Sequence, residues 1–182
     1  VRYSGKDMSI AGDFTVSFWT RIRNSDFGTG VAILIDRSAD VSGSQFRVEV
    51  TADGAVKFSV GETSVTSTVV SRHPVNTYTW FQVQAARTGA ELILTVADDV
   101  LGNDVYTART VTTPFTATDL PETTGTDIVL GSSVNTYRIG LDDLNVSVGG
   151  ASVLVSSFDD LGANFENQAG ALISLMPGLS YR

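Results

Sequence analysis

The residues that could do catalytic chemistry are few and far apart. The chain of 182 residues contains no cysteine and a single histidine, His73. These counts exclude thiolate nucleophiles, disulfides and zinc sites built from several histidines. His73 stands in the turn-like segment Arg72-His73-Pro74, and no Gly-x-Ser-x-Gly segment offers a serine nucleophile. We therefore expect a solvated loop histidine and no Ser-His-Asp triad.

The sequence also shows no pair of acidic residues at a spacing that would let two carboxylates act together in catalysis. A retaining glycosidase needs two carboxyl groups about 5–5.5 Å apart. The glutamates are instead scattered along the chain, at Glu49, Glu62, Glu91, Glu122 and Glu166. Asp142 and Asp143 are adjacent, so that on a strand their side chains would point to opposite faces. We therefore predict that the protein is not an enzyme, and the spacing argues most directly against a glycosidase.

Acidic loop residues form one candidate metal site. Hard cations such as Ca²⁺ prefer oxygen ligands, and the best local cluster lies between two expected strands. It consists of Asp98, Asp99, Asn103 and Asp104. Aspartate and asparagine also stabilise turns through bonds to their own backbone, and turn-forming, solvating aspartates are the alternative interpretation. Calcium is the cofactor we expect if the chain binds one.

Four aromatic residues near expected strand ends are candidates for a ligand surface. Phe27, Tyr78, Tyr106 and Tyr137 occupy such positions. A ring offers an apolar face, and tyrosine adds a polar hydroxyl that suits a half-exposed site. We therefore predict that these four residues contact a ligand, and ordinary surface aromatics are the alternative interpretation.

The balance of charges limits the classes of partner. Twenty acidic residues against 12 basic residues give a formal net charge of -8. A protein that follows the phosphates of a nucleic acid needs a basic surface, so we expect no nucleic-acid partner. No stretch reaches the ~18 consecutive apolar residues of a membrane helix, and we expect no membrane insertion. A hydrophobic content of 42% suffices for the core of one domain.

Alternation of apolar and polar residues predicts a chain of β-strands. The clearest strand covers residues 14–23, where the even positions are mostly apolar and Trp19 is an exception among the odd ones. Asp53-Gly54 joins strands 45–51 and 55–60 as a hairpin turn. Further strands are expected at residues 31–36, 78–86, 91–97, 137–148 and 152–158. Only residues 163–175 have some helical character. The pattern indicates an all-β sandwich of two antiparallel sheets.

Four segments, in order, resemble the laminin-G-like jelly rolls of the concanavalin A-like lectin and glucanase superfamily. They are Gly12-Asp13-Phe14-Thr15-Val16-Ser17-Phe18-Trp19, Thr79-Trp80-Phe81-Gln82-Val83-Gln84, Asp127-Ile128-Val129-Leu130-Gly131 and Tyr137-Arg138-Ile139-Gly140-Leu141-Asp142-Asp143-Leu144. The resemblance implies a jelly-roll sandwich in which Trp19 and Trp80 belong to the core. It also implies calcium in some members of the family. It says little about activity, because this fold carries unrelated functions.

The resemblance also suggests how the chain is divided. We expect the jelly roll to cover residues 1–148 and a C-terminal extension to cover residues 149–182. Within the extension, residues 153–160 resemble the strand that normally opens such a domain. We therefore expect the extension to add an edge strand to the same domain, or to pair with a neighbouring copy, since an unpaired strand edge invites association.

Two functions remain open at this point. The first is a non-catalytic recognition or adhesion module that binds glycan or protein through sandwich loops, on a secreted, cell-surface or virion protein. The second is a structural module that decorates or assembles a particle or a multidomain fibre, with contacts through edge strands and self-association. The chain begins at Val1 without a visible signal peptide, which is uninformative about secretion.

Overall fold

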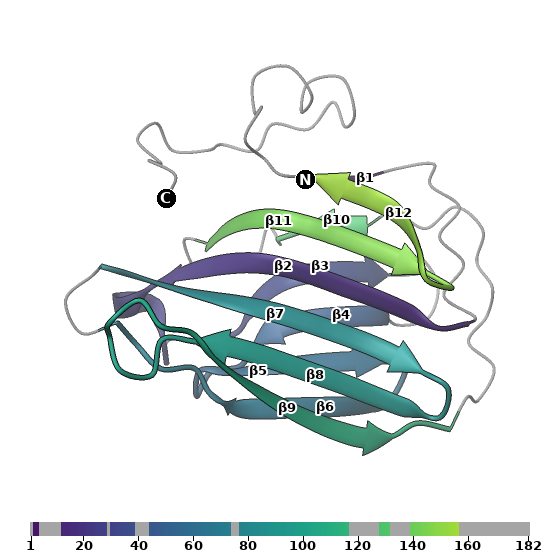
Figure 1. Cartoon of the computed structure of the whole chain (residues 1–182), viewed down its shortest axis with the longest axis horizontal. Helices are drawn as coiled ribbons and strands as arrows, with labels where there is room; N and C mark the ends of the chain where they lie inside the picture. Colours follow the sequence, from purple (N-terminus) through teal and green to yellow (C-terminus); the bar gives the residue numbers. More distant parts are fainter. Residues whose placement is uncertain are drawn as a thin grey trace.

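The chain folds into an all-β jelly-roll sandwich, as the sequence predicts. The computed structural model describes residues 2–3, 12–28, 30–38, 44–73, 77–116, 128–131 and 139–156. Two six-stranded antiparallel sheets, here called sheet A and sheet B, pack face to face. Figure 1 shows sheet B in front of sheet A. None of the described helical segments is long and apolar enough to cross a membrane.

The order of strands within each sheet brings distant segments together. Across sheet A the strands are β1 (Arg2–Tyr3), β10 (Ile128–Leu130), β3 (Ala32–Ser38), β4 (Ser44–Val50), β5 (Ala55–Val60) and β6 (Thr63–Val69). Across sheet B they are β12 (Ala151–Ser156), β11 (Ile139–Val148), β2 (Phe14–Arg23), β7 (Tyr78–Thr88), β8 (Glu91–Asp98) and β9 (Thr107–Pro114). One turn of 3₁₀ helix, η1 (Asn24–Asp26), follows β2.

The hairpin predicted at Asp53-Gly54 is confirmed. Strands β4 and β5 pair in register around Asp53-Gly54, where the Gly54 N–H donates to the Thr51 carbonyl oxygen at 2.9 Å. Gly54 adopts a φ of 92°, and a Cβ there would lie 3.3 Å from the Phe27 ring. Glycine is therefore required at this turn for both its backbone angle and its lack of a side chain. Strands β7 and β8 form the second hairpin.

The core lies between the inner faces of the two sheets. Along β2 the even positions are buried and the odd ones are not, which confirms the predicted alternation. Phe14 of β2 is 2% exposed, and its ring centroid lies 5.2 Å from that of Phe46 in β4 and 6.1 Å from that of Phe58 in β5. Aromatic packing thus joins sheet B to sheet A directly.

Three sheet edges differ from the central strands. Strands β6 and β9 are rich in Ser and Thr and form the edges of sheets A and B on one side of the sandwich. On the other side, β12 pairs with β11 and forms the second edge of sheet B. Residues 151–156 thus belong to sheet B, one of the two sheets of the sandwich. The remaining residues of the expected extension, including 163–175, lie outside the described part of the chain, and the division at residue 148 stays a prediction.

Candidate functional site

Four aromatic residues and one arginine lie together on the outer face of sheet B, and we call them the aromatic–arginine surface. Its members are Trp19, Arg21, Tyr78, Trp80 and Tyr106. The first four alternate along β2 and β7 with residues buried between the sheets, so their side chains leave the outer face of the sheet. Tyr106 comes from the loop that precedes β9. All five are partly exposed.

Direct contacts connect the members of this surface. The guanidinium carbon of Arg21 lies 4.8 Å from the ring centroid of Tyr78 and 5.2 Å from that of Trp80. These are cation–π distances. Trp19 meets Tyr106 edge to face, with ring centroids 4.9 Å apart at 87°. The rings are thus held against neighbours on a rigid sheet, which fixes their orientation before any ligand arrives.

Gly140 of β11 makes room for Arg21. The two residues are partners in the register of β11 and β2. A Cβ at Gly140 would come within 2.8 Å of Nε and 2.9 Å of Cγ of Arg21. The arginine side chain therefore lies across the glycine backbone and is confined on that side by β11, while the rings of Tyr78 and Trp80 contact its guanidinium group.

The expectation that Trp19 and Trp80 belong to the core is wrong. Both are partly exposed on the outer face of sheet B. The alternation itself contained this information, because Trp19 occupies an odd position of β2 and Trp80 shares its parity with Gln82 and Gln84 of β7. The resemblance to the family led to the opposite expectation.

The four aromatic residues predicted to contact a ligand fall into three environments. Tyr78 and Tyr106 lie on the aromatic–arginine surface. Phe27 does not, because it is only 7% exposed and its ring packs beside Gly54, with the guanidinium of Arg72 5.0 Å from the ring centroid. Phe27 is thus buried away from the aromatic–arginine surface, and its contact with a ligand stays a prediction. Tyr137 lies outside the described residues.

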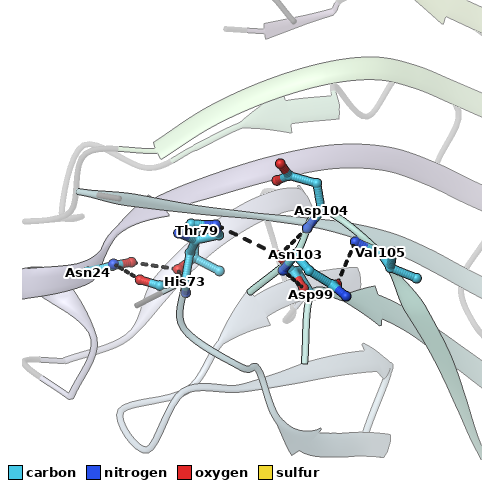
Figure 2. Close-up of polar contacts among 7 residues, drawn as sticks. All are labelled: Asn24, His73, Thr79, Asp99, Asn103, Asp104 and Val105. Carbon is cyan, nitrogen blue, oxygen red and sulfur yellow. Dashed lines mark hydrogen bonds and ion pairs between the residues drawn. The ribbon is translucent and has the colours of Figure 1, made fainter. Parts of the chain in front are cut away.

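Asp99 stabilises the loop between β8 and β9 by accepting hydrogen bonds from the loop backbone (Figure 2). One carboxylate oxygen accepts the N–H of Asn103 at 3.1 Å, and the other accepts the N–H of Asp104 at 2.9 Å. The side-chain oxygen of Asn103 accepts the N–H of Val105 at 3.2 Å. These bonds close a compact turn, which leads directly to Tyr106.

His73 anchors the base of the same loop and is not a solvated loop histidine. Its side chain is 12% exposed, and Nε2 lies 3.9 Å from a carboxylate oxygen of Asp99. Its backbone N–H donates to Thr79 Oγ1, and its carbonyl oxygen accepts a bond from Asn24 Nδ2, both at 3.0 Å. Figure 2 shows this network next to the loop. The expectation of a solvated residue failed because the partners come from distant segments.

Asp98 is separated from the other predicted calcium ligands. It is completely buried, and it accepts bonds from the backbone N–H of Ser71 and from the guanidinium of Arg109. Asp98 continues the inward parity of β8, whereas Asp99 follows the end of the strand. The structure therefore places Asp98 in a contact between the sheets and apart from the loop groups, and its role as a calcium ligand stays a prediction.

The remaining loop groups are close together, and the Asp99 carboxylate among them already has partners. His73, Asp99 and Asp104 each offer one ligand atom, and these atoms lie within 4.8 Å of one another. Calcium prefers six to eight oxygen ligands, whereas one of these three groups is an imidazole and both oxygens of Asp99 accept backbone bonds. Calcium binding by Asp99, Asn103 and Asp104 stays a prediction.

The Asp99 carboxylate gives the loop a defined pH dependence. Burial opposes its ionisation, but the N–H groups of Asp104, Asn103 and Gly102, together with nearby His73, outweigh burial and hold the pKa of Asp99 below its ordinary value of 3.8. A lowered pKa in the folded state means that the ionised carboxylate stabilises the fold above about pH 4, and that this contribution is lost as the pH falls through the folded-state pKa. We expect Asp99→Asn to be less stable than the wild type at pH 7, with a difference that shrinks below about pH 4.

Urea unfolding between pH 7 and pH 2.5 measures this difference. Amide hydrogen exchange at Asn103 and Asp104 reports the loop itself, and we expect faster exchange at both in the variant. Asp104→Asn is the matched control, because it removes the same charge from an exposed position of the same loop. If the Asp99→Asn and wild-type stabilities stay parallel through pH 4, the assigned role of the carboxylate is wrong.

Solved structures with the same fold include binding domains of botulinum neurotoxins. One is botulinum neurotoxin type C, which depends on interaction with two ganglioside molecules to enter cells; it shares 15% identity at a TM-score of 0.52, over 80% of this chain and 34% of that chain. Two more are binding domains of botulinum neurotoxin DC. The complex with SialylT gives 13% identity and a TM-score of 0.53, over 84% and 35% of the two chains. The complex with rat synaptotagmin II shares 14% identity with this chain at a TM-score of 0.52, over 81% of this chain and 34% of that chain.

These similarities support the β-sandwich fold. Because the sequence identities are this low, they support no conclusion about function. The chain spans about a third of the length of each of these structures. No protein-family model and no curated protein sequence matches the chain.

Proposed function

We propose that this chain is a non-catalytic recognition module that binds glycan on the outer face of sheet B. The observation that carries the proposal is the aromatic–arginine surface, in which two aromatic rings contact one guanidinium group and two further rings contact each other. Sugar rings present apolar C–H faces edged by hydroxyl groups. Flat aromatic rings and fixed N–H donors match these two features.

The position of the surface on a sheet favours binding. Trp19, Arg21, Tyr78 and Trp80 project from the two neighbouring strands β2 and β7, which pair over ten residues from Phe14–Arg87 to Arg23–Tyr78. Their backbone is therefore already ordered, and association loses little conformational entropy there. This differs from the predicted loop-based site, because only Tyr106 comes from a loop.

The family resemblance and the structural neighbours support the proposal without deciding it. The laminin-G-like segments occur in order along the described strands, and we infer that the chain belongs with the concanavalin A-like sandwiches. The neighbouring toxin structures interact with gangliosides and with synaptotagmin II, which are a glycan-bearing lipid and a protein. By analogy of fold, we infer an extracellular, cell-surface or virion location for this module.

Removal of one ring tests the proposed site. We expect Trp80→Ala to weaken glycan binding by about tenfold or more, because the stacking area of a buried or half-buried aromatic dominates such contacts. A broad glycan array identifies ligands for the wild type, and isothermal titration then measures each affinity. The array is run with and without Ca²⁺, which also tests the calcium prediction.

Gln84→Ala provides the matched control. Gln84 lies on the same face of β7 as Trp80 and is exposed, but it belongs to no contact of the aromatic–arginine surface. We expect it to bind like the wild type. Silence of the wild-type protein across the array, or equal binding by Trp80→Ala and wild type, would overturn the proposed site.

A further inference from the structure

We infer that the glycan recognised by this surface carries a carboxylate, and that Arg21 binds that carboxylate. The inference rests on the proposed glycan-binding function and adds the chemical class of the ligand. It is carried by the placement of Arg21 within the surface and by the groups that hold its side chain.

Arg21 is central to the surface. It lies on β2, the strand between β11 and β7, and its register partners are Gly140 on one side and Trp80 on the other. The ring of Tyr78 lies 4.8 Å from its guanidinium carbon. A sugar that stacks on these rings would therefore place its substituents within reach of the guanidinium group.

The environment of Arg21 also fixes the plane of its guanidinium group. Contacts with the rings of Tyr78 and Trp80 restrict the flat group, and the absence of a side chain at Gly140 leaves space for Nε and Cγ. An arginine guanidinium carries its N–H groups in one plane, as a fork that matches the two oxygens of a carboxylate. A neutral hydroxyl would use only part of that fork.

The overall charge makes a local contact necessary for an anionic ligand. The chain has a formal net charge of -8, so its long-range field repels anions. Affinity for a carboxylated sugar must then come from short-range hydrogen bonds at a specific cation. Such bonds depend on the geometry of the group as well as on its charge, which distinguishes arginine from lysine.

Matched glycan pairs test the inference directly. Each pair differs only in one carboxylate, for example a uronic-acid oligosaccharide and its neutral hexose counterpart, or a sialylated glycan and its desialylated form. We expect the wild type to prefer the acidic member by about tenfold or more. We expect Arg21→Gln to lose that preference while it retains weaker binding of both members, and Arg21→Lys to recover only part of it.

Two further variants separate geometry from charge and from folding. Arg23→Gln removes the same charge from an exposed position two residues along the same strand, and we expect it to keep the preference. Gly140→Ala leaves Arg21 in the chain but places a Cβ against its side chain, and we expect it to reduce the preference. The melting temperature of each variant shows whether it is folded.

The outcomes distinguish this inference from the function on which it rests. If the wild type binds both members of each pair equally, the carboxylate inference is wrong and the glycan-binding proposal stands. If Arg21→Gln keeps the full preference while folded, another group binds the carboxylate and the inference fails. If no glycan of either kind binds, the proposed function fails and the inference fails with it.

Discussion

Replacement of Asp98 by alanine is expected to lower the free energy of unfolding by about 3–5 kcal/mol, the range typical for breaking a buried charged pair by removal of one partner. Asp98 is 0% exposed and accepts bonds from Ser71 and Arg109. Its loss leaves a backbone N–H without its acceptor and a partly buried guanidinium without its counter-charge. The part-buried N–H then lacks compensation in the folded state, whereas the guanidinium, on a side chain that is 33% exposed, is partly solvated.

The location of Asp98 explains why one side chain has so large an effect. Asp98 ends β8 in sheet B, Arg109 belongs to the edge strand β9, and Ser71 follows the edge strand β6 of sheet A. Arg109 also donates to the Val69 carbonyl oxygen at 3.5 Å. The carboxylate therefore ties the edges of the two sheets together where Ser- and Thr-rich strands contribute little apolar packing.

Chemical denaturation of Asp98→Ala and wild type measures the loss, and Asp104→Asn is the control from the same region. Asp104 is exposed and has a φ of 61°, which asparagine tolerates, so we expect this replacement to change stability by less than about 0.5 kcal/mol. Both measurements are repeated with Ca²⁺ and with a chelator. If Asp98 were a calcium ligand, chelation would destabilise the wild type and leave Asp98→Ala unchanged, because binding to the folded state alone stabilises it. The structural role predicts the same loss in both conditions.

The sandwich was predictable where its strands have one apolar and one polar face. Strands β2, β4, β5, β7 and β8 alternate because one face of each packs against the other sheet. Strands β6 and β9 were not predicted, because they lie at sheet edges and lack the regular apolar face that identifies a strand in the sequence. In β6 only Val65 is buried. Their place in the fold depends on pairing with β5 and β8, which no local pattern encodes.

The candidate site was harder to predict than the fold, for two physical reasons. Parity along β7 and β8 could have placed Trp80 outward and Asp98 inward, but the family resemblance and the loop cluster pointed elsewhere. In contrast, the approach of His73 to Asp99 joins residues that are 26 positions apart, and the stacking of Arg21 on Tyr78 requires the pairing of β2 with β7. Contacts of that kind follow only from the assembled sheets.

The aromatic–arginine surface and the core occupy opposite faces of the same strands. Phe18, Thr20 and Ile22 of β2 are buried between the sheets, while Trp19 and Arg21 alternate with them on the outer face. Packing of the core therefore holds the residues of the aromatic–arginine surface in place, although these residues are not part of the core. This arrangement allows the outer residues to be changed in binding experiments with limited effect on folding.

Replacement of Phe14 by alanine is the second change with a large expected effect, about 3–5 kcal/mol of unfolding free energy. Phe14 is 2% exposed at the start of β2 and lies between the sheets. Its ring contacts that of Phe46 with centroids 5.2 Å apart, and that of Phe58 in a near-perpendicular arrangement at 84°. The alanine variant loses both aromatic contacts and leaves a cavity that the paired strands around it cannot close. Equilibrium unfolding in urea measures the loss.

A double-mutant cycle with Phe46→Ala isolates the contact between the sheets. We expect a coupling of about 0.5–1.5 kcal/mol between the two rings, beyond the area that each buries. Phe14→Leu keeps most of the buried volume and remains folded if Phe14→Ala does not, and Val31→Ala, at a position that is 46% exposed, should change stability by less than about 0.5 kcal/mol. Additive effects of Phe14→Ala and Phe46→Ala would show that these rings do not join the sheets. Unchanged stability of Phe14→Ala would locate the core of the sandwich elsewhere.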